Sequence, residues 1–266
     1  MSIGGGEMKV ACVQLDIAFG NPKENFHKVE GKIREAATLG AKIVVLPEMW
    51  NTGYDLTRLD KIADAEGKDT KKLFSQLSKE LKIYIVGGSV SIKKRDKFYN
   101  TMYVTSDSGE IISEYNKAHL FKLMDEHLYL DEGNQRNLFS IEGMDMGGII
   151  CYDLRFPEWT RVHVLDGAKV LFIPAQWPDK RIDHWKTLLQ ARAIENQIFI
   201  VAVNRVGHDP NNSFNGNSMV IAPWGEVLWV GENEETTHIV DLNLNEIEQV
   251  RNTIPVFLDR REVLYK

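Results

Sequence analysis

Cysteine is scarce in this chain of 266 residues, which has only Cys12 and Cys151. A disulfide framework and a zinc site built from clustered cysteines are therefore excluded. No apolar run approaches the roughly 18 residues of a membrane span, and no signal-peptide core follows the first residues. We expect a cytoplasmic protein, because thiols stay reduced in that compartment.

An excess of positive charge is also lacking, since 32 basic residues face 38 acidic ones and the net charge is −6. This balance argues against a general nucleic-acid binder. Glycine pairs occur at Gly87-Gly88 and Gly147-Gly148 but match no phosphate loop or dinucleotide fingerprint, and no histidine pair has HExxH spacing. We therefore expect no nucleotide cofactor, no metal, no nucleic-acid partner and no membrane partner.

Strand and helix patterns alternate along the chain, which predicts a layered α/β domain. Many strands with few helices favour two stacked sheets with helices outside. Asn21-Pro22 predicts a helix start and Gly40 its end, and 83–90 reads as one strand. We expect one domain over 8–266, preceded by a flexible extension over 1–7 that is not native. The stretch 251–266 lacks strong periodicity and is a candidate for packing on another subunit.

Three reactive side chains each follow a strand that we expect to be buried. Glu48 follows KIVVLP, Lys117 follows IISEYN and Cys151 follows MGGII. The carboxyl ends of strands are where ligand sites assemble in α/β sheets. We therefore expect an acid, a cation and a thiol to meet at one sheet edge.

Cys151 lies where a strand turns into a helix, in GGIICYDLRFPEW. This pattern resembles a nucleophile elbow, which exposes its side chain and aims the following N–H groups at an anion. The alternative is a buried structural thiol, the commoner fate of a single cysteine. Cys12, in the middle of a predicted strand, reads as core.

Glu48 and Lys117 each have a functional and an ordinary interpretation. Desolvation beside an apolar run disfavours the charged form of a carboxylate, which suits Glu48 to proton exchange. Lys117 can stabilise an oxyanion and favour a nearby thiolate, with Glu126 as a second carboxylate that orients it. The alternatives are an exposed strand-end acid and a solvated lysine. A cysteine–histidine pair stays open, although His119 reads as structural.

Four segments together resemble the nitrilase superfamily of carbon–nitrogen hydrolases. They are VVLPEMWNTGY around Glu48, EYNKAHLF around Lys117, EHLYLDEG around Glu126 and GGIICYDLRFPEW around Cys151. The resemblance covers about Met8 to Tyr265. It implies an αββα sandwich that forms a homodimer, and a catalytic triad of Glu48, Lys117 and Cys151 assisted by Glu126.

Further segments resemble the ω-amidase branch, among them IPAQWPDKRIDHWKTLLQARAIENQ, VAVNRVG and SMVIAPWGEVL. The resemblance implies hydrolysis of the terminal amide of a 2-oxo acid such as 2-oxoglutaramate, through a thioester on the cysteine. Other amides, N-carbamoyl amines, deaminated glutathione and nitriles are alternative substrates for the same triad. A non-catalytic binding module on the same fold is the alternative from another class.

The substrate of such an enzyme carries a carboxylate, which a protein of net charge −6 must meet with local positive charge. Arg155 and Arg181 are the candidates, because guanidinium binds carboxylate through two hydrogen bonds. Arg155 has an alternative as a structural ion pair with Asp153 or Glu158. The backbone N–H of Tyr152 is the expected oxyanion donor. Trp177 and Tyr54 either form a wall of the pocket or serve ordinary packing.

Overall fold

The computed structural model describes residues 7–265, and the strands over this range form two large sheets. The first sheet draws on both ends of the chain, with β7 (Ile111–Asn116) paired to β6 outside the main strand order. That order is β16 (Thr236–Asn243), β1 (Glu7–Gln14), β2 (Ile43–Val45), β4 (Tyr84–Val86), β6 (Lys97–Thr105), β5 (Val90–Lys94) and β3 (Asp64–Ala65).

The second sheet comes from the later half of the chain. Its order is β15 (Val227–Val230), β14 (Met219–Ile221), β11 (Phe199–Val203), β10 (Val170–Pro174), β9 (Met144–Gly148) and β8 (Leu138–Ile141). A separate hairpin pairs β12 (Val206–His208) with β13 (Ser213–Asn215). At the centre of the second sheet, β9 pairs with β10 and β10 with β11 in parallel. The paired residues are apolar and buried on both faces, as expected for parallel strands.

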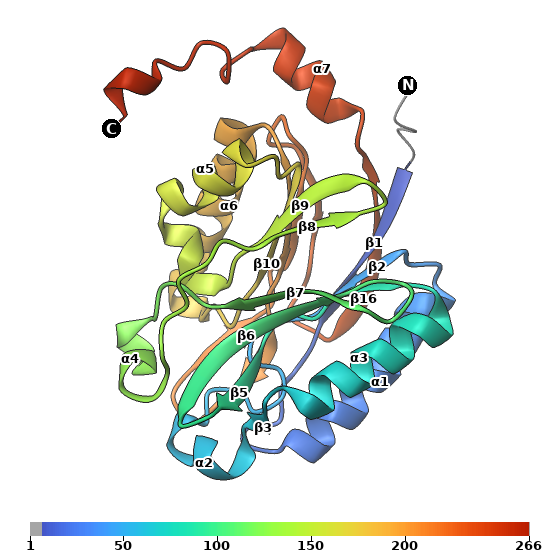
Figure 1. Ribbon diagram of the computed structural model, residues 1–266, viewed down its shortest axis with the longest axis vertical. Helices are drawn as coiled ribbons and strands as arrows, with labels where there is room; N and C mark the ends of the chain where they lie inside the picture. Colours follow the sequence, from blue (N-terminus) through green and yellow to red (C-terminus); the bar gives the residue numbers. More distant parts are fainter. Residues whose placement is uncertain (1–6, 266) are drawn as a thin grey trace.

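Helices cover the outer face of each sheet (Figure 1). On the first sheet lie α1 (Pro22–Thr38) and α3 (Lys68–Leu81), and on the second lie α5 (Pro157–Leu165) and α6 (Ile182–Asn196). The remaining helices are α2 (Leu59–Ile62), α4 (Glu126–Tyr129), α7 (Glu246–Thr253) and the short 3₁₀ helices η1 (Leu56–Arg58), η2 (Lys122–Met124), η3 (Cys151–Arg155), η4 (Asp179–Arg181) and η5 (Glu262–Leu264). The expected four-layer αββα sandwich is confirmed.

Burial on both faces of β1 shows how the layers are held together. Val10 and Cys12 join the core between the two sheets, whereas Ala11 and Val13 pack toward α1 and α3. Successive side chains of a strand point to opposite faces, so one apolar run supports two cores. Cys12 is fully buried, and burial raises the pKa of its thiol to about 12. Its prediction as core is confirmed.

Two predicted boundaries differ from the structure. The strand expected over 83–90 is two strands, β4 and β5, because the chain reverses at Gly87 and Gly88, where Gly88 has a φ of +60°. The extension expected over 1–7 ends sooner, since Glu7 is the first residue of β1 and residues 1–6 lie outside the described part. The helix start at Asn21 is confirmed: its side chain accepts a hydrogen bond from the Glu24 N–H.

The last segment described, from Ile254 to Tyr265, runs across the top of the molecule beyond α7 (Figure 1). It carries several exposed apolar side chains. Within residues 7–265, no helix is both long and apolar enough to cross a membrane.

Candidate active site

Glu48 is fully buried at the end of the segment that follows β2. The backbone bends at this point, because Met49 has a φ of 46°, a left-handed value that is uncommon for a residue with a side chain. Ser89 holds the bend from the neighbouring turn. Its hydroxyl accepts a hydrogen bond from the Met49 N–H at 2.9 Å, and its N–H donates to the Pro47 carbonyl at 3.1 Å.

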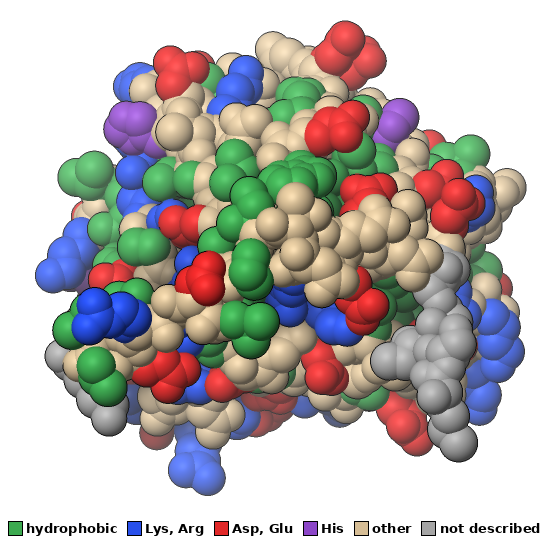
Figure 2. Space-filling model, turned by 90° about the horizontal axis from the view of Figure 1, so that it is seen from above, with side chains coloured by type: hydrophobic (Ala, Val, Ile, Leu, Met, Phe, Trp, Pro, Cys, Tyr) green, Lys and Arg blue, Asp and Glu red, His purple; other side chains and the backbone are tan. Residues whose placement is uncertain are grey.

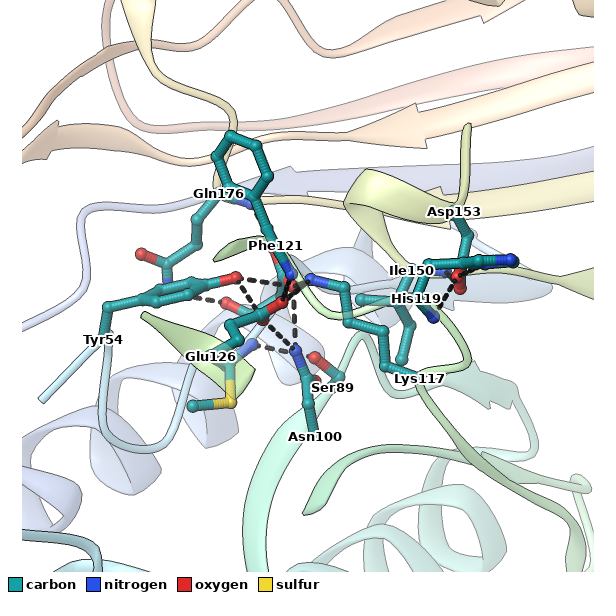
Figure 3. Close-up of polar contacts among 12 residues, drawn as sticks. Tyr54, Ser89, Asn100, Lys117, His119, Phe121, Glu126, Ile150, Asp153 and Gln176 are labelled. Carbon is teal, nitrogen blue, oxygen red and sulfur yellow. Dashed lines mark hydrogen bonds and ion pairs between the residues drawn. The ribbon is translucent and has the colours of Figure 1, made fainter. Parts of the chain in front are cut away.

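Lys117 follows β7, and its ammonium contacts two buried carboxylates, of which Figure 3 labels that of Glu126. Its ammonium donates to Glu48 Oε1 at 2.8 Å and to the two oxygens of Glu126 at 2.8 and 2.9 Å, and all three side chains are fully buried. The hydroxyl of Tyr54 lies 2.9 Å from Glu48 Oε1 and 2.8 Å from Glu126 Oε1. The structure therefore brings together three of the predicted residues and adds the Tyr54 phenol to them.

The charges of this cluster shift the pKa values of its members. Burial lowers the pKa of Lys117, but Glu126 and Glu48 outweigh burial and the net pKa is raised, so the lysine stays an ammonium. Burial raises the pKa of Glu126, and Lys117 offsets this only in part. The pKa of Tyr54 is raised by burial and by the two carboxylates, so the phenol keeps its proton.

Cys151 is the first residue of η3. Only Ile149 and Ile150 separate it from β9 of the second sheet. Its φ of 46° is a strained left-handed value, as a sharp strand-to-helix turn requires. Its thiol lies close enough to Glu48 and Lys117 for both charges to shift its pKa. Burial and then Glu48 raise the pKa of the thiol well above its usual range, and Lys117 lowers it by less. Lys117 therefore acts in the predicted direction, toward the thiolate, but burial and Glu48 outweigh it.

The three strand ends come from two sheets rather than one edge, which corrects the prediction. Glu48 and Lys117 follow strands of the first sheet, whereas Cys151 follows a strand of the second. β7 is half-exposed, not a buried strand. The site therefore lies where the ends of the two facing sheets meet.

A narrow cavity of about 10 Å³ opens beside Cys151. It is lined by Phe121, Cys151, Tyr152, Arg155, Gln176, Trp177, Pro178 and Arg181. This volume has room for about one water molecule, so the side chains that line the cavity lie close together beside the thiol. Tyr54 does not line it. Tyr54 lines a separate open cleft instead. Its hydroxyl contacts the carboxylates of Glu48 and Glu126.

Arg155 and Arg181 both face this cavity, and neither forms an ion pair with a carboxylate anywhere in residues 7–265. The Arg155 guanidinium lies over the Trp177 ring at 4.7 Å and 3.3 to 3.4 Å from His184 Nδ1. The alternative of an ion pair with Asp153 or Glu158 is therefore wrong. Burial lowers the pKa of Arg155. Arg181 lies over the Phe121 ring at 5.4 Å.

Asn100 and Gln176 belong to the site but were not predicted. Asn100 donates its side-chain N–H to Glu48 Oε1 at 2.8 Å. Gln176 donates its backbone N–H to Glu48 Oε2 at 2.8 Å and its side-chain N–H to the Glu48 carbonyl at 2.9 Å, while Arg205 holds its side-chain oxygen at 3.1 Å. Gln176 follows the apolar strand β10, so the strand-end signal that identified Glu48 could have identified it too.

The stretch after Lys117 does not stay extended, because β7 ends at Asn116. His119 therefore lies in an irregular segment, where its side chain is not placed by the alternation of a strand. It contacts the buried Asp153 through its N–H at 3.0 Å and through Nδ1 at 2.7 Å. Its prediction as a structural histidine agrees with this position, and no Cys151–His119 contact forms.

Comparison with known proteins decides the family. The family model described as carbon–nitrogen hydrolase matches residues 9–252. This chain belongs to the carbon–nitrogen hydrolase family. The predicted membership of the nitrilase superfamily is thereby confirmed.

Several carbon–nitrogen hydrolases resemble the chain over nearly its whole length. A 2-oxoglutaramate amidase of Bacillus subtilis is 49% identical over 256 residues, covering 96% of this chain and 98% of that protein. An omega-amidase of Homo sapiens is 33% identical, covering 97% and 96%. The solved structure of a CN-hydrolase superfamily protein from Xanthomonas campestris, with an arsenic adduct in its active site, has a TM-score of 0.90 at 29% identity and covers 96% of this chain and 97% of that one.

Proposed function

We propose that this carbon–nitrogen hydrolase is an ω-amidase, which converts 2-oxoglutaramate-type amides to the 2-oxo dicarboxylate and ammonia. The observation that carries the proposal is an ammonium in contact with a carboxylate, both close enough to a thiol to shift its pKa, beside a cavity that also presents two arginines without acidic partners. The 49% identity to a 2-oxoglutaramate amidase supports the choice of substrate.

In the proposed acylation step, Glu48 takes the thiol proton as the Cys151 sulfur attacks the amide carbon. The carbonyl oxygen becomes an oxyanion, which Lys117 and the Tyr152 N–H stabilise, each such donor being worth about 3 kcal/mol in well-studied sites. Glu48 then gives its proton to the amide nitrogen and ammonia leaves, so that a thioester on Cys151 remains.

In the proposed deacylation step, Glu48 takes a proton from water as the water oxygen attacks the thioester carbon. The carbon–sulfur bond breaks, the sulfur recovers a proton, and the acid leaves. Glu126 holds the Lys117 ammonium through both steps with two hydrogen bonds. No cofactor enters either step.

The two arginines are the proposed binding site for the carboxylate of the substrate. Arg155 is half-buried without a carboxylate partner, which disfavours its charged form, and a substrate carboxylate would supply that partner. We assign this role to Arg155 and Arg181, with Trp177 as the wall against which Arg155 is held. Tyr54 orients the two glutamates from the opposite side.

A substrate panel tests the proposal. Ammonia release is measured with 2-oxoglutaramate, simple aliphatic amides, an N-carbamoyl amine, deaminated glutathione and a nitrile. We expect the highest kcat/KM for 2-oxoglutaramate, with a higher KM in Arg155→Met. If 2-oxoglutaramate is hydrolysed no faster than aliphatic amides, the substrate assignment fails.

We propose a homodimer as the assembly, with residues 8–266 as one domain per subunit. Hydrophobic side chains gather on the face that bears the C-terminal segment (Figure 2). Leu258 is 87% exposed and Val263 77% exposed in the single chain. Such a cluster is typical of a protein interface. The cytoplasmic location and the absence of nucleic-acid and membrane partners stay predictions from composition.

A further inference from the structure

Asp153 is a buried carboxylate two residues after Cys151, and it lies outside the cluster of Glu48, Lys117 and Glu126. Four groups converge on it. Asp153 Oδ2 accepts hydrogen bonds from the Ile150 N–H at 2.9 Å and from the Tyr115 hydroxyl at 2.7 Å. On Oδ1 are the N–H and the Nδ1 of His119, at 3.0 and 2.7 Å.

These contacts join the two segments that deliver the thiol and the ammonium. Ile150 directly precedes Cys151, and Tyr115 and His119 lie two residues before and after Lys117. In Figure 3, Asp153 and His119 lie on one side of Lys117 and Glu126 on the other. The two segments belong to different sheets, so this carboxylate spans the gap between the sheets next to the reacting groups.

The chemistry of the contacts requires an ionised carboxylate. Backbone N–H groups only donate, and the Tyr115 phenol keeps its proton because burial and then Asp153 raise its pKa. Because His119 Nδ1 faces a carboxylate oxygen, we assign a proton to Nδ1. All four groups then donate to the two oxygens of Asp153. An asparagine would turn an NH₂ group toward at least one of these donors, and the network could not be satisfied.

Neighbouring groups fix both donors on the Lys117 side. The Tyr115 oxygen accepts from the Ala118 N–H and from the Trp159 indole, both at 3.2 Å. The His119 ring stacks on Phe156 with centroids 3.8 Å apart and an interplanar angle of 13°. Since Phe156 follows η3, this stack is a second tie between the same two segments.

We propose that Asp153, with His119 as its partner, is a positioning residue that sets the place of the Lys117 ammonium relative to the Cys151 sulfur. The part of this inference that concerns turnover rests on the proposed amidase function. Asp153 touches none of the reacting groups and acts through the two backbones. A displacement of about 1 Å in such a site costs on the order of 100-fold in rate.

The test combines turnover with the pH dependence of Cys151 alkylation by iodoacetamide. In Asp153→Asn we expect kcat for 2-oxoglutaramate to fall about 100-fold with KM within about threefold. We also expect the alkylation midpoint to move to higher pH, because a displaced Lys117 no longer lowers the thiol pKa. Alkylation is followed by peptide mapping, with Cys12 as the internal buried reference.

Two variants of His119 separate positioning from general destabilisation. His119→Asn keeps an N–H near the place of Nδ1, whereas His119→Phe keeps the stack on Phe156 and loses the donor. We expect His119→Asn to recover most of the wild-type kcat and alkylation midpoint, and His119→Phe to follow Asp153→Asn. This pair carries the test if Asp153→Asn does not fold.

The two proposals fail in different ways. A wild-type protein without amidase activity contradicts the proposed function, while alkylation still reports on Asp153. Folded Asp153→Asn and His119→Phe proteins with the wild-type alkylation midpoint overturn the positioning role, whatever the substrate. Equal loss in both His119 variants also overturns it, because the donor would then not matter.

Discussion

At the scale of single residues, the state of Cys151 decides which chemistry the site can perform. Burial and Glu48 hold the pKa of the thiol well above its usual range, so the resting site contains a thiol. A thiol is a poor nucleophile. Glu48 must therefore remove the proton as the sulfur attacks, and its position against both Lys117 and Cys151 allows this transfer.

Glu48→Gln separates proton transfer from thiolate formation. The variant removes the negative charge that raises the Cys151 pKa and leaves the Lys117 ammonium, which lowers it. We expect the pH midpoint of Cys151 alkylation to fall, while turnover drops by at least about 100-fold because the base is lost. A midpoint that stays in place or rises would contradict the charge balance described here.

One site residue, Asn100, marks the limit of prediction from sequence. Glu48, Lys117 and Cys151 follow strand patterns and lie in segments typical of a family. Asn100 lies inside β6, where nothing local separates it from an ordinary strand residue. Its contact with Glu48 depends on how β6 lies relative to the end of β2, and that arrangement is set by tertiary packing.

At the scale of elements, the turn between β4 and β5 shapes the site. The sequence predicts one continuous strand here, since the flanking residues are apolar and β-branched. The structure breaks the strand because Gly88 has a φ of +60° and passes close to the backbone of Pro47. Its neighbour Ser89 then reaches the segment that carries Glu48. A glycine pair inside an apolar run is compatible with such a close approach, but the prediction of one continuous strand did not use it.

Gly88→Ala tests the role of this turn. A Cβ at this position would lie 2.0 Å from the Pro47 carbonyl oxygen, and alanine is unfavourable at this φ. We expect the free energy of unfolding to fall by about 2 kcal/mol or more, and kcat to fall because Glu48 moves with Pro47. Chemical denaturation and ammonia release measure the two effects.

Gly31→Ala is the matched control. Gly31 lies within α1, and an added Cβ meets no atom within 4 Å. We expect this variant to gain about 0.5–1 kcal/mol in stability and to keep the wild-type kcat. If Gly88→Ala were as stable and active as Gly31→Ala, the turn would have no part in holding Glu48.

At the scale of the whole molecule, two facing sheets form one site. Alternating strand and helix patterns predict a layered α/β chain, and the family resemblance implies the αββα order. The sequence pattern alone placed the three reactive residues at one sheet edge. It could not assign the strands to two sheets, because pairs such as β1 with β16 join residues more than 200 positions apart. Which distant strands pair is decided by how the layers pack, and no local sequence pattern records it.

At this scale we predict that the C-terminal segment forms the dimer interface. Leu258→Glu with Val263→Glu should shift the assembly from dimer toward monomer in light scattering after size exclusion, because charge is placed in the proposed interface. Leu39→Glu, at the end of α1, is the control for an exposed leucine elsewhere and should leave the dimer intact. A wild-type monomer, or a dimer that the double variant leaves unchanged, would contradict the proposed assembly.

The central claim is that Cys151 forms a covalent bond to the acyl group of an amide within reach of Glu48 and Lys117. Rapid quenching during turnover of a slow amide, followed by mass spectrometry of the peptides, tests it most directly. The account predicts an acyl mass on the peptide that contains Cys151, none on the peptide that contains Cys12, and neither adduct nor turnover in Cys151→Ala. An adduct on Cys12 alone, or ammonia release that persists in Cys151→Ala, would contradict it.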